Sequence, residues 1–258
     1  MAPGRRGLCA GALLIALINP AWSADRTVSL QARPDLKPGP AAMPQIEAPV
    51  DEAERRINAA LRRLDGKVRE AARACRAEGG AHSSWTRSIR TPMRGPRFLS
   101  IAITDDTFCG GAHPNVSTMS IVYDLTTGTP VDWTTLLPGS LTGKVVLATG
   151  ADGTRMVTLS SKALHALYQK FYRRGPADPK REGDDAACRE AVAETSLGEP
   201  PAMMAWLDAK AGGLAVQFDL IHAVQACADP VIIPTDTLRC EGAQPVLIDA
   251  LEAAHRAP

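Results

Sequence analysis

The feature of this sequence with the most potential for chemistry is a histidine inside a glycine-rich loop. His113 lies in the run Cys-Gly-Gly-Ala-His-Pro-Asn at 109–115, with Asp105 and Asp106 before it and Asp124 after it. A histidine beside a carboxylate can act as a general base, because the carboxylate orients the imidazole and stabilises its charged form. A single histidine without a second one nearby is a poor ligand set for a transition metal.

The same loop also has an architectural interpretation. Gly110 and Gly111 allow positive φ and Pro114 fixes the backbone at the exit, so the His113 ring would brace the turn by bonding to backbone groups. We favour this brace over catalysis. The metalloprotease, nucleophile-elbow, P-loop and dinucleotide-binding motifs are all absent from the sequence. We therefore predict no catalytic residue, no metal site and no cofactor.

A basic segment precedes the loop. It contains Trp85, Arg87, Arg90, Arg94 and Arg97. An anionic partner such as a cell-wall polymer would suit it, but alternating arginines on a solvated strand are the commoner arrangement. The whole chain of 258 residues carries a formal charge of only +1, so we expect no nucleic-acid partner.

Alternating apolar residues predict the strands that hold the loop. Strands over 98–104 and 115–124 flank it, and a turn after Asp124 leads into a short strand at 129–132. Adjacent strands joined by short turns favour an antiparallel meander. Further strands are predicted near 214–220 and 231–238.

Apolar residues three and four apart predict the helices. Such a stripe runs from Ile57 to Cys75, with Asp51 as a possible N-cap and Gly79-Gly80 as the stop. Similar spacing predicts helices over 156–171, from Asp184 onward, and over 245–254. Together these elements predict one α+β domain over 51–258, in which an antiparallel meander packs against helices. Five prolines predict an extended linker over 24–50.

The N-terminus has the three parts of a secretory signal. Arg5 and Arg6 precede an apolar run at 7–18, and Ala21-Trp22-Ser23 offers small residues for cleavage. The apolar run is too short to span a bilayer. We expect a signal peptide at 1–23, no membrane anchor after cleavage, and a periplasmic or secreted protein.

Five cysteines follow the signal, and an oxidising compartment favours their pairing. They are Cys75, Cys109, Cys188, Cys227 and Cys240. No C-x-x-C motif occurs, and counting cannot decide the connectivity.

The segments at 97–115, 122–128 and 133–137 resemble the RsiV-like C-terminal domain family. The family signature is a strand, a G-G-A-H-P-N loop, a second strand that ends in Y/F-D-L-x-T-G, and a short helix; residues Gly110 to Asn115 and Tyr123 to Gly128 match it. The resemblance implies an α+β extracytoplasmic domain. In RsiV this domain is a receptor for lysozyme, and in other architectures similar domains accompany a polysaccharide deacetylase without being the catalyst.

The resemblance also bears on the disulfides and on function. It implies Cys75 with Cys109 and Cys188 with Cys227, which leaves Cys240; the rival pairing is Cys227 with Cys240. The expected function is a soluble, non-catalytic periplasmic binding module that recognises a lysozyme-like cell-wall enzyme or a peptidoglycan fragment. Its candidate binding residues are Gly110, Gly111, His113 and Asn115. The alternative is a cell-envelope hydrolase that uses His113 with Asp105, Asp106 or Asp124.

Overall fold

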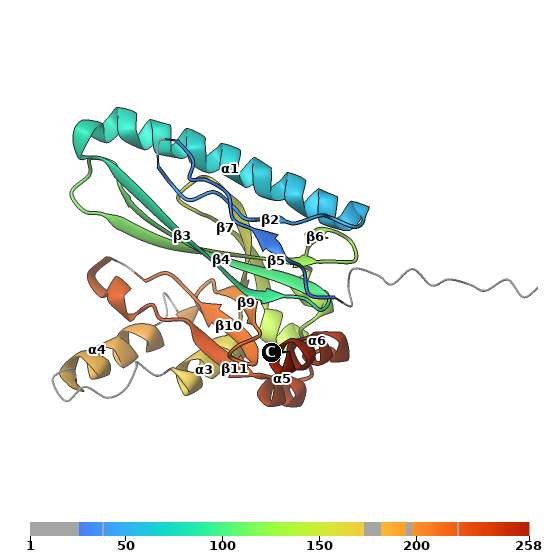
Figure 1. The fold of residues 1–258 in the computed structure, drawn as a ribbon. Coiled ribbons are helices and arrows are strands. Elements are labelled where there is room, and N and C mark those ends of the chain that lie inside the picture. The colour runs from blue at the N-terminus through green and yellow to red at the C-terminus, as the bar shows by residue number, and fades with distance from the viewer. Residues whose placement is uncertain (1–25, 38, 173–181, 195–197, 221, 258) are drawn as a thin grey trace, which may run out of the picture.

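A long helix lies over an antiparallel sheet at the top of the molecule (Figure 1). The helix is α1 (Glu52–Gly79), and the strand order of the sheet is β3–β4–β5–β6. The computed structural model describes residues 26–257 apart from 38, 173–181, 195–197 and 221, so the predicted signal peptide at 1–23 lies outside the described residues. No helix of the described residues is long and apolar enough to cross a membrane.

The strands of the described residues form four sheets. The largest consists of β3 (Ser84–Arg94), β4 (Phe98–Phe108), β5 (Asn115–Asp124) and β6 (Thr129–Pro130). The second consists of β9 (Met204–Asp208), β10 (Gly213–Gln217) and β11 (Val231–Pro234) in the order β11–β10–β9. Two hairpins complete the set: β1 (Leu30–Gln31) with β2 (Gln45–Ile46), and β7 (Lys144–Thr149) with β8 (Arg155–Ser160).

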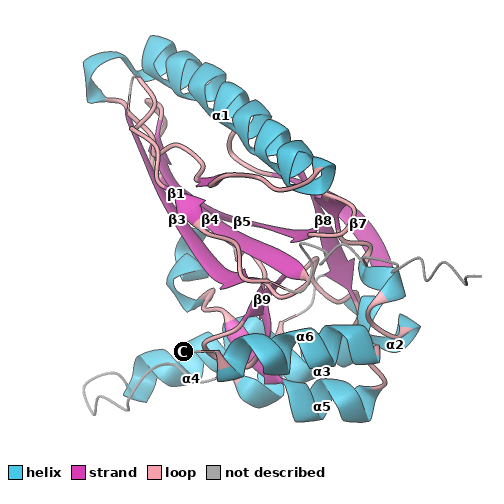
Figure 2. Ribbon diagram, turned by 45° about the vertical axis from the view of Figure 1, so that its right-hand side comes forward, coloured by secondary structure: helices cyan, strands magenta, loops and turns pink. Residues whose placement is uncertain are grey.

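The shorter helices gather mainly below the second sheet (Figure 2). They are α3 (Lys162–Phe171), α4 (Glu182–Ala193), α5 (Thr235–Glu241) and α6 (Pro245–Arg256), with α2 (Gly139–Thr142) at the edge. Short 3-10 turns occur at Gly80–His82, Trp133–Thr135 and His222–Cys227. The molecule therefore consists of layers: α1, the main sheet, the second sheet and the shorter helices. The predicted α+β class with antiparallel strands is confirmed.

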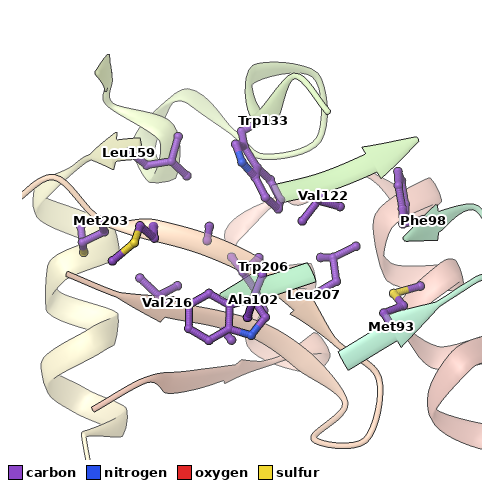
Figure 3. Close-up of a cluster of buried hydrophobic side chains, with 14 of the residues drawn as sticks. Met93, Phe98, Ala102, Val122, Trp133, Leu159, Met203, Trp206, Leu207 and Val216 are labelled. Atoms are coloured by element: carbon purple, nitrogen blue, oxygen red, sulfur yellow. The ribbon is translucent and has the colours of Figure 1, made fainter. Parts of the chain in front are cut away.

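The main sheet is covered on both faces, by α1 on one and by the second sheet on the other. Side chains of each strand alternate between these two faces. On the lower face the Ser100 hydroxyl accepts the Leu207 N–H at 3.1 Å, and the Ser120 hydroxyl donates to the Ala205 carbonyl at 3.0 Å. These bonds join β4 and β5 to β9 inside an apolar cluster that contains Phe98 and Trp206 (Figure 3). The alternate side chains of β4 lie on the other face of the sheet and point toward α1.

The buried stripe of α1 carries polar groups as well as apolar ones. Glu54, Asn58 and Asp65 are buried, and each bonds to the segment before the helix. Glu54 accepts the Val50 N–H, and Asp65 accepts the Met43 N–H at 2.8 Å. Asn58 pairs with both the N–H and the carbonyl of Ile46, as a neighbouring strand would.

Residues 26–50 of the predicted extended linker are packed against the domain. Val28, Met43 and Ile46 are buried in the main core, and the Val28 N–H donates to the Arg94 carbonyl of β3 at 2.8 Å. We call the described residues 26–50 the N-terminal arm. The prolines keep the arm extended, while the polar residues of α1 provide the bonding partners that hold it.

The prediction for the basic segment is wrong at Arg87, which is buried at the centre of an ion cluster. Its Nε and one Nη donate to Asp105 at 2.7 Å each, and the same Nη lies 3.0 Å from Asp152. The Trp85 Nε1 also donates to Asp105. Asp152 lies in the turn between β7 and β8, so the cluster joins that hairpin to the main sheet.

Two local predictions are also wrong. Residues 156–160 belong to strand β8 and not to a helix, because they pair with β7; the helix starts only after Ser161, whose hydroxyl accepts the Leu164 N–H. Residues 235–238 belong to α5, since β11 ends at Pro234.

We predict that Asp105→Asn destabilises the fold strongly. The substitution removes the carboxylate charge that neutralises the buried Arg87 guanidinium, which costs about 3–5 kcal/mol. The neighbour Asp106 is exposed, so Asp106→Asn should change the free energy of unfolding by less than about 0.5 kcal/mol. Urea denaturation of both variants measures the difference, and equal effects would contradict the structural role of the cluster.

A second prediction concerns pH. Burial raises the pKa of Asp65 above its usual 3.8, although the Met43 N–H and Arg33 oppose this. The folded state therefore binds the proton more tightly than the unfolded chain, and this contribution to stability is lost as the pH rises through the folded pKa. Asp65→Asn keeps a hydrogen-bond acceptor for the Met43 N–H and removes the titrating carboxyl, so the variant does not lose this stability as the pH rises. Its stability relative to wild type should rise between pH 3.5 and pH 7, as measured by chemical denaturation, while Asp35→Asn at an exposed position should show no such trend.

Candidate functional site

The glycine–histidine loop is the tip of the β4–β5 hairpin. Thr107 pairs with Asn115 in the last rung before the loop. The tip lies at the end of the sheet, below the C-terminal end of α1 (Figure 1). All residues from Gly110 to Asn115 are exposed.

A disulfide attaches the tip to the helix. Cys75 in the last turns of α1 is bonded to Cys109, with their Cα atoms 4.6 Å apart. The bond closes a loop of 34 residues, which in the chain-entropy model stabilises the folded state by about 4 kcal/mol. It joins the two elements that flank the tip at the point where each ends.

A contact between two glycines adds to the disulfide. A Cβ on Gly79 would lie 2.7 Å from the Cys109 carbonyl carbon and 2.8 Å from the Gly110 nitrogen. Gly110 itself has φ 91°, and a Cβ there would lie 2.9 Å from the Gly79 Cα. Only residues without a side chain allow this approach. The backbone of the tip is therefore fixed against the end of α1.

The His113 side chain is exposed at the tip. Two restraints on the loop backbone are the disulfide and the glycine contact. Two of the predicted binding glycines thus have different surroundings: Gly110 is packed against α1, whereas a Cβ on Gly111 would meet nothing within 4 Å.

The carboxylates considered as partners of His113 are mostly engaged elsewhere. Asp105 is fully buried and bonded to Arg87 and Trp85. Asp124 pairs with Phe98 at the far end of the hairpin, where Arg97 donates to its carboxylate at 2.8 Å. Of the three, only Asp106 lies near the tip in an exposed position. The structure therefore does not assemble the general-base arrangement with Asp105 or Asp124.

A second disulfide lies in the lower half of the molecule. Cys188 of α4 is bonded to Cys227, and Cys240 is exposed and unpaired. These are the pairings that the family resemblance implied. Two disulfides suit an oxidising, extracytoplasmic compartment. Within the described ranges, no three His, Cys, Asp or Glu side chains gather where they could hold a metal ion.

One sequence signal for this tip is the pair Gly79-Gly80. It predicts the end of the first helix, and Gly80 ends α1 with φ 59°. The close approach of Gly79 to Gly110 could not be predicted, because it depends on how α1 crosses the sheet.

Comparison with known proteins supports the fold. No protein-family profile and no curated protein sequence matches the chain. A solved structure of a DUF3298 family protein from Pseudomonas aeruginosa aligns with 87% of this chain and 98% of its own, with a TM-score of 0.53 and 12% sequence identity. A DUF3298 family member from Bacteroides fragilis covers 88% of this chain and 95% of its own, with a TM-score of 0.49 and 13% identity. At this identity the first structure establishes a shared fold and no activity; RsiV-like domains belong to the same group.

We predict that Gly79→Ala displaces the tip. The added methyl group would overlap backbone atoms of Cys109 and Gly110, which should cost about 1–3 kcal/mol. Gly111→Ala is the matched control, because a Cβ there meets open space. Thermal unfolding and amide exchange of the 109–116 backbone should change for the first variant and stay near wild type for the second.

Proposed function

We propose that this chain is a non-catalytic binding module of the cell envelope whose disulfide-fixed tip recognises a cell-wall enzyme of the lysozyme type. The observation that carries the proposal is the Cys75–Cys109 bond together with the Gly79–Gly110 contact. Both restrain an exposed loop that buries few side chains and so receives little stabilisation from the hydrophobic core. A loop held in one conformation loses less entropy on binding, so restraint of this kind favours recognition.

The arrangement of charges supports binding over catalysis. Hydrolysis by general acid and base requires a histidine or carboxylate positioned at a site that encloses the substrate. Asp105 and Asp124 are held by arginines, and none of the cavities described here is lined by residues 110–115. The alternative of a hydrolase therefore has no specific observation in its favour.

The shape of the tip favours a protein partner over a glycan fragment. Small ligands bind in concave sites that bury most of their surface. The tip is the end of a hairpin and projects outward, so it suits a partner that supplies the concave surface itself. The catalytic cleft of a cell-wall hydrolase is such a surface. The resemblance to a family with a lysozyme receptor agrees with this choice, and export to the periplasm would place the chain beside such enzymes.

Binding of the mature chain, from Ala24 onward, to immobilised lysozyme tests the proposal. We expect saturable binding. The double variant His113→Ala with Asn115→Ala should weaken it by about tenfold, since loss of contacts at the centre of an interface typically costs more than 1 kcal/mol. Thermal unfolding checks that the double variant is folded at the assay temperature, so that the loss of binding is assigned to the tip.

A matched control lies at the opposite end of the same sheet. Thr129→Ala alters an exposed residue of β6 and should leave binding unchanged. Absence of lysozyme binding by a folded, oxidised sample would overturn the proposal. Binding that tip and control variants weaken equally would also overturn it, and binding of peptidoglycan fragments alone would assign the module to the glycan instead.

A further inference from the structure

The space between α1 and the main sheet is filled differently on its two sides. On the side of β3 the N-terminal arm occupies it: Leu36 and Ala42 pack with Val68 of the helix and Trp85 of β3. On the side of β5 the turn between β7 and β8 reaches the helix, and the Lys67 ammonium donates to the Gly153 carbonyl at 3.5 Å. A cavity is found there.

This cavity has a volume of about 340 Å³ and is lined mainly by apolar groups. Ala60 and Leu64 contribute from α1, Ile121 and Tyr123 from β5, and Trp133 and Val157 from the segments beyond. Leu64, Ile121 and Val157 are only partly buried by the protein, although they pack against the main core. A pocket with apolar walls and a few polar groups is the usual form of a small-molecule site.

The charged groups of the cavity all have one sign. Arg63 and Lys67 of α1 and Arg155 of β8 belong to the lining, which contains no Asp or Glu. None of the three forms an ion pair with another described residue. Three exposed cations beside apolar walls create a positive potential that an anion would neutralise.

Arg63 and Lys67 are fixed on the cavity side by the geometry of the helix. They lie three and seven residues after Ala60, a spacing that places them on one face. The opposite face of α1 carries Asn58 and Asp65, which hold the arm. Arg63 lies near Tyr123 of the same lining: burial raises the pKa of Tyr123 to about 12, and the Arg63 charge opposes that rise.

We infer that this cavity binds an amphiphile with one apolar chain and one anionic head group, the chain lying between α1 and β5 and the head group lying against Arg63, Lys67 and Arg155. This site is separate from the tip and goes beyond the proposed function. A water-sized group takes about 30 Å³, so the volume of 340 Å³ accommodates roughly eleven such groups. The ten carbons of decanoate fit this volume, and its carboxylate would lie outside it against the exposed cations.

Titration calorimetry with decanoate, well below its micelle-forming concentration, tests the inference on the mature, oxidised protein. We expect saturable binding to one site. Decyltrimethylammonium has the same chain and the opposite charge, and should not bind measurably. Arg63→Glu should weaken decanoate binding by about tenfold or more, because it removes a charged hydrogen-bond donor to the head group and places a carboxylate there.

Two control variants on the same helix separate the cavity from general effects. Arg73→Glu makes the same charge change at an exposed position outside the lining, and should alter binding by less than about twofold. Ala60→Phe fills the cavity and should abolish binding, whereas Ala77→Phe at an exposed position should not. Thermal unfolding confirms that each variant is folded.

The inference is overturned if folded wild-type protein does not bind decanoate. It is also overturned if both surfactants bind alike, or if Ala60→Phe and Ala77→Phe bind equally, because adsorption to the surface then explains the signal. Lysozyme binding by the tip is measured independently, so either site can fail without affecting the other.

Discussion

The rest of the structure depends on how α1 satisfies its buried polar groups. A helix of 28 residues lies across the main sheet with Glu54, Asn58 and Asp65 in its buried stripe. A buried polar group without a partner costs free energy comparable to a lost hydrogen bond, so these side chains require donors and acceptors. The N-terminal arm supplies them through backbone groups of Met43, Ile46 and Val50. The polar side chains of the helix therefore fix the position of the arm, and the arm in turn covers them.

The two proposed sites follow from this arrangement. The arm fills the space on the side of β3, whereas on the side of β5 the helix, the strand and the β7–β8 hairpin line the cavity. Because the helix extends to the end of the sheet, its last turns meet the β4–β5 tip, where Cys75 and Gly79 hold Cys109 and Gly110. The long helix thus defines a restrained surface loop at one end and a lined cavity along one side.

The lower half of the molecule provides the support. Hydrogen bonds between the backbone of β9 and the hydroxyls of Ser100, which accepts, and Ser120, which donates, join the two sheets within an apolar cluster. The Arg87 cluster ties the β7–β8 turn to the main sheet, and β8 in turn contributes Arg155 and Val157 to the cavity. A buried ion pair of this kind adds little net stability, but removal of one partner leaves an uncompensated charge. Its effect is to fix the position of the hairpin.

The sequence by itself determined the elements with regular patterns. Alternation predicted β4 and β5, with Ile101 and Ile121 on one face, and the apolar stripe that ends at Cys75 predicted α1. These signals are local, since each depends on residues a few positions apart. Tertiary structure decided the rest: Arg87 is buried because its partners Asp105 and Asp152 lie 18 and 65 residues away, and residues 156–160 form a strand because β7 pairs with them. The same holds for the arm and for both sites, because partners distant in sequence create the burial and charge that define them.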